Sequence, residues 1–177
     1  MTAHDPVTHA LGRYPEGVEG VYDTYAGLPV TGISDLGPDG EPPSAADHAW
    51  RLWDYLEYGA KDGVAESVRR FFGEVDTRRV RAVVVPEYTG RGGSLGDAVR
   101  LLAEHADDLP ELRAVFLGAV RGDMYQISWI EHGDVTPLLE AFPKLERLEV
   151  CGNSQEGLRL RPVRHDALRM LRFESGG

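Results

Sequence analysis

The chain has 177 residues, enough for one ordinary domain, and its 42% hydrophobic and 27% charged residues exclude a collagen-like or wholly disordered polypeptide. A net charge of −10 excludes a general nucleic-acid binder, which needs a basic surface to displace counterions from phosphates. The sequence shows no secretory leader and no apolar run of the roughly 20 residues that a membrane span needs. It contains a single cysteine, Cys151. These features predict a cytoplasmic protein without membrane or nucleic-acid partners.

Residues 1–43 are rich in proline and glycine and predict an irregular N-terminal arm with one short extended piece, LPVTGI at 28–33. Strand and helix signals alternate from residue 44 onward, so we expect a separate α/β region over 44–177. Three segments carry apolar residues at helical spacing, namely 62–76, 94–108 and 134–142. The residues expected to cap them are Asp62, Ser94 and Asp134.

Four short apolar segments predict parallel strands: VRAVVV (80–85), LRAVFL (112–117), LERLEV (145–150) and LRMLRF (168–173). Each has the hydrophobic pattern L-x-x-L-x-L, and successive copies begin 32, 33 and 23 residues apart, the last without a helix before it. Self-similarity at such a period is typical of a solenoid of supersecondary units. An ordinary doubly wound α/β sheet has buried strands at similar spacing and is the alternative.

The segment AWRLWDY at 49–55 fits two periods. Its apolar residues suit a helix stripe that stops at Gly59, and they also suit a short strand. The distance from Leu52 to Val83 is 31 residues, which continues the repeat spacing and favours the strand.

The stretch FPKLERLEVCGN contains L-x-x-L-x-V-x-x-N, from Leu145 to Asn153, and only this copy has asparagine at the ninth position. Side chains alternate between the two faces of a strand. We therefore expect the apolar positions to be buried together and Glu146 and Glu149 to be exposed. The expected buried set is Leu145, Leu148 and Val150.

With these residues the chain resembles leucine-rich-repeat proteins of the ribonuclease-inhibitor type, and more narrowly a family of actinobacterial-type cytoplasmic repeat proteins. The stretches that carry the resemblance are AGLPV (26–30), VDTRRVRAVVV (75–85), LPELRAVFLG (109–118), ISWIEHGDVTPLLEAFPKLERLEV (127–150) and LRPVRHDALRMLRFESGG (160–177). The resemblance implies an α/β partial horseshoe with parallel strands on the concave face and helices on the convex face. It also implies that C-terminal repeats found in other members are missing here. The family supplies no reaction.

In such a horseshoe, the strand residues between the inward ones line the hollow, and they change from apolar to charged along the array. We expect the apolar ones, Ala82, Val84, Ala114 and Phe116, to be covered by the arm around residues 22–33. The residues predicted to bind a partner are Phe116, Arg147, Glu149, Met170 and Arg172. The first functional prediction is a non-catalytic module that binds a protein partner, and the acidic balance favours a basic one.

The alternative function is a small α/β enzyme or a nucleotide- or phosphate-binding domain that uses the glycine-rich loop 89–96, with Glu87, Arg91 and His105 nearby. The loop spacing, G-x-G-x-x-x-G, matches neither the dinucleotide nor the Walker pattern. The six histidines have no metal-binding spacing, and His165 stands at a turn where a structural hydrogen bond is expected. We therefore expect no catalytic residue, metal or cofactor.

The last strand segment has no following helix to cover it. Solenoids bury the apolar flank of each unit against a neighbour, so a terminal unit needs a cap. We expect Leu168, Leu171 and Phe173 to be only partly protected, and the edge to be completed by further repeats or by self-association.

Overall fold

The computed structural model describes residues 24–37, 41–53, 63–86, 95–119, 130–153 and 157–175. In these ranges the strands are β1 (Thr24–Tyr25), β2 (Leu28–Gly32), β3 (Ala49–Arg51), β4 (Ala82–Pro86), β5 (Ala114–Ala119), β6 (Arg147–Cys151) and β7 (Met170–Glu174). The α-helices are α2 (Gly63–Glu74), α3 (Leu95–Glu104) and α4 (Thr136–Ala141). Short 3-10 turns cover η1 (Ile33–Asp35), η3 (Thr77–Arg79) and η4 (Ala106–Asp108).

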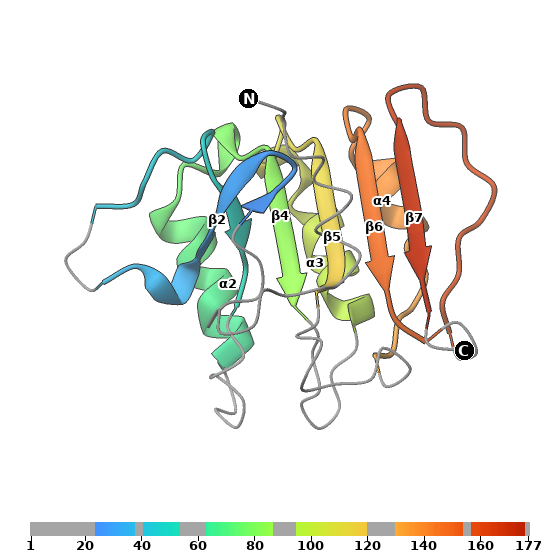
Figure 1. Ribbon diagram of the computed structural model, residues 1–177, viewed down its shortest axis with the longest axis horizontal. Coiled ribbons are helices and arrows are strands. Elements are labelled where there is room, and N and C mark those ends of the chain that lie inside the picture. Colours follow the sequence, from blue (N-terminus) through green and yellow to red (C-terminus); the bar gives the residue numbers. More distant parts are fainter. Residues whose placement is uncertain are drawn as a thin grey trace.

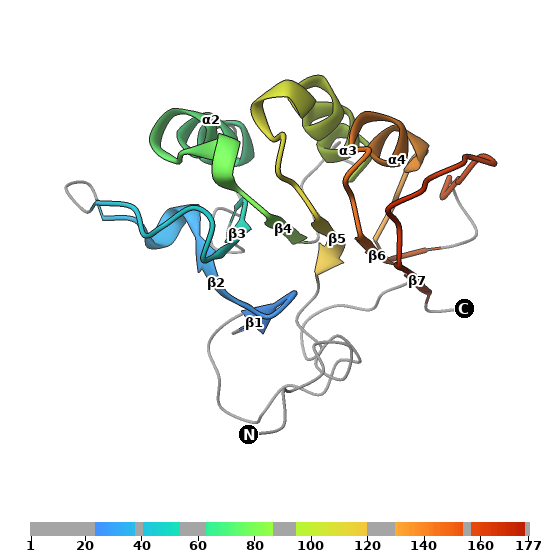
Figure 2. The same cartoon turned by 90° about the horizontal axis from the view of Figure 1, so that it is seen from above.

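The strands form one curled sheet of seven strands, counted over the described ranges, and they lie in chain order from β1 to β7 (Figure 1). β1 and β2 are antiparallel, and every later neighbour is parallel. Parallel connections in one sheet are right-handed, so an order that never reverses places every crossover on the same side. Figure 2 shows α2, α3 and α4 on one face of the sheet. The strand order has no reversal point and so differs from a doubly wound sheet.

The same turn precedes three of the parallel strands. In each, a backbone N–H donates to the carbonyl three residues earlier: Val80 to Thr77 (3.1 Å), Leu112 to Leu109 (3.1 Å) and Leu145 to Phe142 (2.9 Å). The first apolar residue of each predicted strand therefore belongs to the turn. The observed strands consequently begin two residues later than the sequence pattern predicts.

The last unit of the sheet uses an extended segment where the others have a helix. Residues 157–165 run alongside the start of α4, where Val135 N–H donates to the Arg159 carbonyl at 2.9 Å. His165 then replaces the usual turn, because its Nδ1 accepts the Leu168 N–H at 3.1 Å. Its Nε2–H donates to the carbonyl of Phe142 at 2.9 Å, so the expected structural role is confirmed. An extended link explains the shorter spacing of this copy.

The main core lies between the sheet and its helices. Register rows stack Val83, Val115, Leu148 and Leu171 in one line and Val85, Leu117, Val150 and Phe173 in the next. The predicted set is buried: Leu145 and Leu148 are 0% exposed and Val150 is 1% exposed. Complete burial of such a side chain is worth about 1.5–3 kcal/mol, so these rows hold the helices onto the sheet.

The N-terminal region contributes more to the sheet than the sequence indicates. β2 lies within the predicted extended piece 28–33, but it pairs in parallel with β3, so the sheet extends into the segment assigned to the arm. β3 confirms the strand interpretation of the segment that begins at Ala49, and Trp50 is completely buried. Residues 1–23 and the predicted caps Asp62 and Ser94 lie outside the described residues.

The helix predictions hold with shifted ends. α2 and α3 lie within segments 62–76 and 94–108, and η4 follows α3. α4 begins at Thr136, where the N–H donates to the carboxylate of Asp134 at 2.9 Å, so the predicted capping side chain is used. None of the helices in the described part of the chain is long and apolar enough to cross a bilayer.

Leu148 and Leu171 offer a matched pair for testing the core, because they are register neighbours on the same face of the sheet and differ in exposure, 0% against 44%. We expect Leu148→Ala to lower the free energy of unfolding by about 2–5 kcal/mol, since it leaves a cavity. Leu171→Ala should cost the monomer less than about 1 kcal/mol, because this residue is already 44% exposed and its truncation leaves no closed cavity. Urea titrations measure both, and equal midpoints would contradict the arrangement.

Candidate partner-binding face

The face of the sheet that carries no helix of the described residues is here called the helix-free face, and it includes two register rows that run from β3 to β7. The first row contains Ala49, Ala82, Ala114, Arg147 and Met170. The second row contains Arg51, Val84, Phe116, Glu149 and Arg172. Both rows are small or apolar in β4 and β5 and change to charged and long side chains in β6 and β7. The sequence analysis predicted this gradient, and every residue of its predicted binding set lies on this face.

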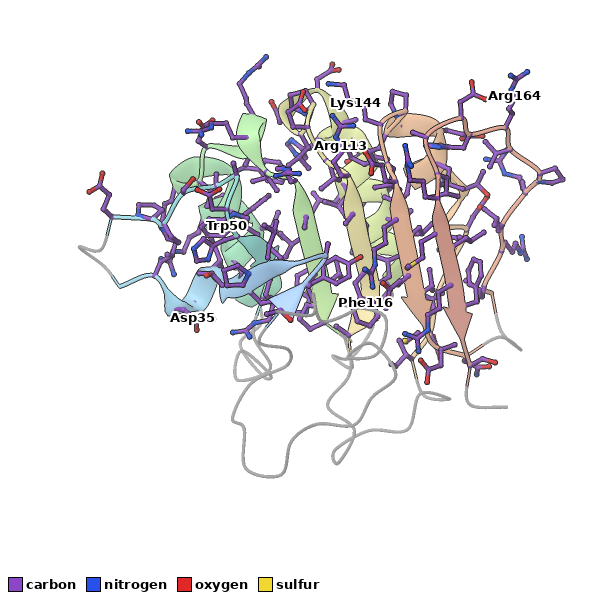
Figure 3. All side chains as sticks on the ribbon, turned by 45° about the horizontal axis from the view of Figure 1, so that its top comes forward. Asp35, Trp50, Arg113, Phe116, Lys144 and Arg164 are labelled. Atoms are coloured by element: carbon purple, nitrogen blue, oxygen red, sulfur yellow. The ribbon has the colours of Figure 1, made fainter. Side chains whose placement is uncertain are left out.

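The β1–β2 hairpin covers the apolar part of the helix-free face (Figure 2). The ring of Tyr25 lies 5.7 Å from the ring of Phe116, between centroids, and Figure 3 shows Phe116 beside the hairpin. Ala82, Val84, Ala114 and Phe116 are no more than 3% exposed. The expectation that these residues are covered is thus confirmed, and Tyr25 falls within the segment predicted to cover them.

The charged part of the helix-free face is a buried ion-pair network. Arg147 and Arg172 both pair with Glu149, and Arg172 also pairs with Glu174. The Arg172 Nη1 lies 3.6 Å from the Glu149 Oε2. The side chain of Glu149 is only 1% exposed, against 10% for Arg147 and 16% for Arg172. A carboxylate this deeply buried needs cationic partners, because its lost hydration must be replaced.

Tyr25 connects the two parts of the face. The guanidinium carbon of Arg147 lies 5.1 Å from the centroid of the Tyr25 ring, a cation–π arrangement. Burial raises the pKa of the Tyr25 phenol well above its usual value, and the negative charge of Glu149 adds to the rise while Arg147 opposes it. The phenol therefore stays protonated, and Arg147 is held between an aromatic ring and a carboxylate.

The predicted binding residues divide into two groups by exposure. Phe116, Arg147 and Glu149 are buried, so the expectation that Glu149 is exposed is wrong. Met170 and Arg172 are partly exposed and remain accessible at the β6–β7 end. The sequence did contain a signal for the network. Residues of opposite charge, Arg147, Glu149 and Arg172, occupy the same face of two predicted neighbouring strands, which favours ion pairs over solvation.

Cys151 follows the network at the end of β6 and is buried. Burial raises the pKa of its thiol to about 12, and the carboxylate of Glu174, 3.7 Å from the sulfur, adds to the rise. The thiolate is the reactive form of cysteine. A buried thiol that stays protonated near neutral pH acts as a packing residue.

His132 is a structural residue at the carboxyl ends of β5 and β6. Its Nε2–H donates to the carbonyl of Cys151 at 2.7 Å, and burial lowers the pKa of its ring. A Cβ at Gly152 would lie 2.2 Å from that Nε2, and a Cβ at Gly118 would lie 2.1 Å from the Cys151 carbonyl oxygen. Both glycines therefore permit the close approach of β5, β6 and the His132 ring.

The glycine-rich loop of the alternative function lies outside the described residues, apart from Leu95 and Gly96 at the start of α3. The N–H of Leu95 donates to the carbonyl of Glu131 at 3.3 Å, so one amide at this helix end already has a protein acceptor. In the described ranges no group of three or more histidine, cysteine, aspartate or glutamate side chains could hold a metal ion.

A second charged cluster lines the amino ends of β5 to β7, where Figure 3 shows Arg113 and Lys144. Glu111 pairs with Lys144 at 2.6 Å and with Arg113 at 3.2 Å, while Glu146 pairs with Arg113 at 3.3 Å and with Arg169 at 4.0 Å. These side chains are substantially exposed, and such pairs contribute about 0–1 kcal/mol each. They align equivalent positions of successive units and do not form an enclosed site.

No known family profile matches the chain, and no curated protein matches it. The structure is similar to the crystal structure of a protein from Bacteroides fragilis, with a TM-score of 0.56 and 21% sequence identity. The match covers 72% of this chain and 35% of that protein, so this chain spans about a third of its length. At this level of identity the likeness concerns the fold alone.

Removing the buried carboxylate tests the ion-pair network. We expect Glu149→Ala to lower the free energy of unfolding by about 3–5 kcal/mol, because Arg147 and Arg172 would be left without their shared counter-charge. The double variant Arg147→Met/Glu149→Leu should recover at least half of that loss, since Arg172 keeps Glu174. Denaturant titration is the measurement. A cost for Glu149→Ala below about 1 kcal/mol is the value typical of an exposed position and would contradict the network.

The raised thiol pKa predicts slow chemistry at Cys151. At pH 8 the folded protein should react with an aromatic disulfide reagent at least about 100-fold more slowly than the denatured chain, because little thiolate is present. The absorbance of the released thiolate follows both reactions. Similar rates in the folded and the denatured protein would show that Cys151 is accessible and ionised.

Proposed function

We propose that the protein is a non-catalytic, leucine-rich-repeat-type interaction module of the cytoplasm that binds a protein partner through the helix-free face. The recurring units support the repeat classification. The same i to i−3 turn precedes β4, β5 and β6. In addition, the carbonyls of Arg81, Arg113 and Glu146 each accept two N–H groups from the start of the following strand. Repetition of one backbone geometry at one spacing is characteristic of solenoid units.

The observation that carries the proposal is the accessible end of the helix-free face. No helix of the described residues covers this face (Figure 2). Met170 and Arg172 are partly exposed at its β6–β7 end. Buried neighbours hold Arg172 from two sides, because Glu149 and Glu174 both pair with it. Side chains fixed before binding lose little conformational entropy when a partner docks.

The buried members of the predicted set support the face in this proposal. Phe116 and Arg147 position Tyr25, and Glu149 positions Arg172, so none of the three needs to touch the partner. A net charge of −10 favours a partner whose contacting surface is basic. The protonated, buried Cys151 thiol supports a module without nucleophilic chemistry at this face.

Affinity capture with face-specific variants tests the proposal. We expect Met170→Lys to reduce recovery of a bound protein from extracts of the source organism at least tenfold, because the new charge repels a basic partner at the centre of contact. Pro162→Lys makes a similar charge change at an exposed position of the extended segment that follows β6, and it should leave recovery unchanged.

Two outcomes would count against the module. Equal recovery with Met170→Lys and with the wild-type protein would remove the β6–β7 end of the helix-free face from binding. A specific thermal shift with nucleotides or inorganic phosphate would favour the alternative, a ligand site at loop 89–96.

A further inference from the structure

Among the described strands β7 is the outermost, and β6 pairs with only one side of its backbone. The Met170 N–H donates to the Glu146 carbonyl at 3.0 Å, and the Glu174 carbonyl accepts the Gly152 N–H at 2.9 Å. The peptide groups of these even-numbered residues therefore point toward β6. Because N–H and C=O groups alternate along a strand, those of Leu171 and Phe173 point toward the open edge. Such an edge is a template for another strand.

The exposed apolar side chains gather at the same end. The large hydrophobic residues that the described part of the chain exposes are Leu160 (36%), Leu171 (44%) and Phe173 (41%). Leu171 and Phe173 lie in register with the buried Leu148 and Val150, on the face that helices cover elsewhere. In Figure 2 the helix layer ends at α4, and among the described elements only the extended segment follows it.

We propose that β7 pairs with β7 of a second copy of this chain, antiparallel about a two-fold axis, with Phe173 opposite Phe173 of the second copy. An antiparallel pair of identical strands is closed and self-complementary, as a two-fold interface requires. The pairing continues the sheet across the dimer and uses the N–H and C=O groups of Phe173, which point away from β6. It also brings the exposed Leu171 and Phe173 side chains of both copies onto one shared apolar surface.

Charge complementarity selects this register. With Phe173 at the centre, Arg172 of each copy lies directly opposite Glu174 of the other, which adds two pairs of opposite charge. Centring the pair on Arg172 would place two arginines opposite each other, and like charges in that position are unfavourable. Centring it on Leu171 would place Arg169 opposite Phe173, so the charge would face an aromatic ring without a counter-ion.

The apolar residues of this pairing, Leu171 and Phe173, face away from Met170 and lie on the other face of the sheet, whereas Arg172 takes part in both proposals. The dimer is tested by the molar mass of the protein in solution, and the partner site is tested by recovery of a different protein. Failure of one leaves the other standing.

Light scattering after size-exclusion chromatography of the full chain tests the dimer. We expect twice the chain mass of 19.5 kDa for the wild-type protein. Phe173→Pro removes an N–H that points to the open edge and blocks strand addition, so it should raise the dissociation constant at least tenfold. Glu174→Arg should do the same by placing arginines opposite each other. Arg164→Glu, at a side chain 89% exposed beyond the strand, is the control and should remain dimeric.

Cross-linking reports the register. Under mild oxidation Phe173→Cys should give a covalent dimer, because the two new thiols face each other, and Leu171→Cys should not. A monomeric wild-type protein at about 100 μM, or a dimer that persists in both edge variants with unchanged circular dichroism, would overturn the proposal. A Leu171→Cys cross-link without one from Phe173→Cys would overturn the register.

Discussion

The strands of this sheet lie side by side in the order in which the chain makes them, and each parallel connection crosses on the same side. That constraint gathers α2, α3 and α4 on one face, and no helix of the described ranges lies on the other. The branched apolar residues of β4, β5 and β6 on the helix side then become the main core. The opposite face needs another cover to keep its apolar residues from water, or it must bind a partner.

The buried residues of the helix-free face are kept from water in two different ways. Over β4 and β5 the residues are small or apolar, and the β1–β2 hairpin covers them with Tyr25. Over β6 and β7, Glu149 pairs with Arg147 and Arg172, Arg172 also pairs with Glu174, and the Tyr25 ring covers Arg147. Tyr25 takes part in both the apolar cover and the charged network, because its ring contacts Phe116 and also Arg147. Loss of the ring would therefore expose apolar surface and weaken the support of a buried cation together.

The ends of the sheet differ in how they are closed. The hairpin turns the first edge onto the helix-free side, whereas β7 has no described strand on its outer side and carries two exposed apolar residues, Leu171 and Phe173. The extended link before β7 gives this unit a complete turn through His165, although it lacks a helix. A regular strand whose outer side is uncovered can pair with another strand. In this respect the edge of β7 differs from the helix-free face, where side chains would make the contacts.

The sequence by itself determined the units of the fold. The L-x-x-L-x-L pattern specified β4 to β7 to within two residues, because strand burial alternates, and helical spacing located α2, α3 and α4. It also identified the alternate strand residues that lie on the helix-free face, the first being Ala82 and the last Arg172. The tertiary structure decided which of them meet water. Glu149 is buried only because β7 supplies Arg172, β6 supplies Arg147, and a hairpin from the other end of the chain supplies Tyr25. Burial of a charge depends on partners brought together by folding, and a local pattern contains no information about them.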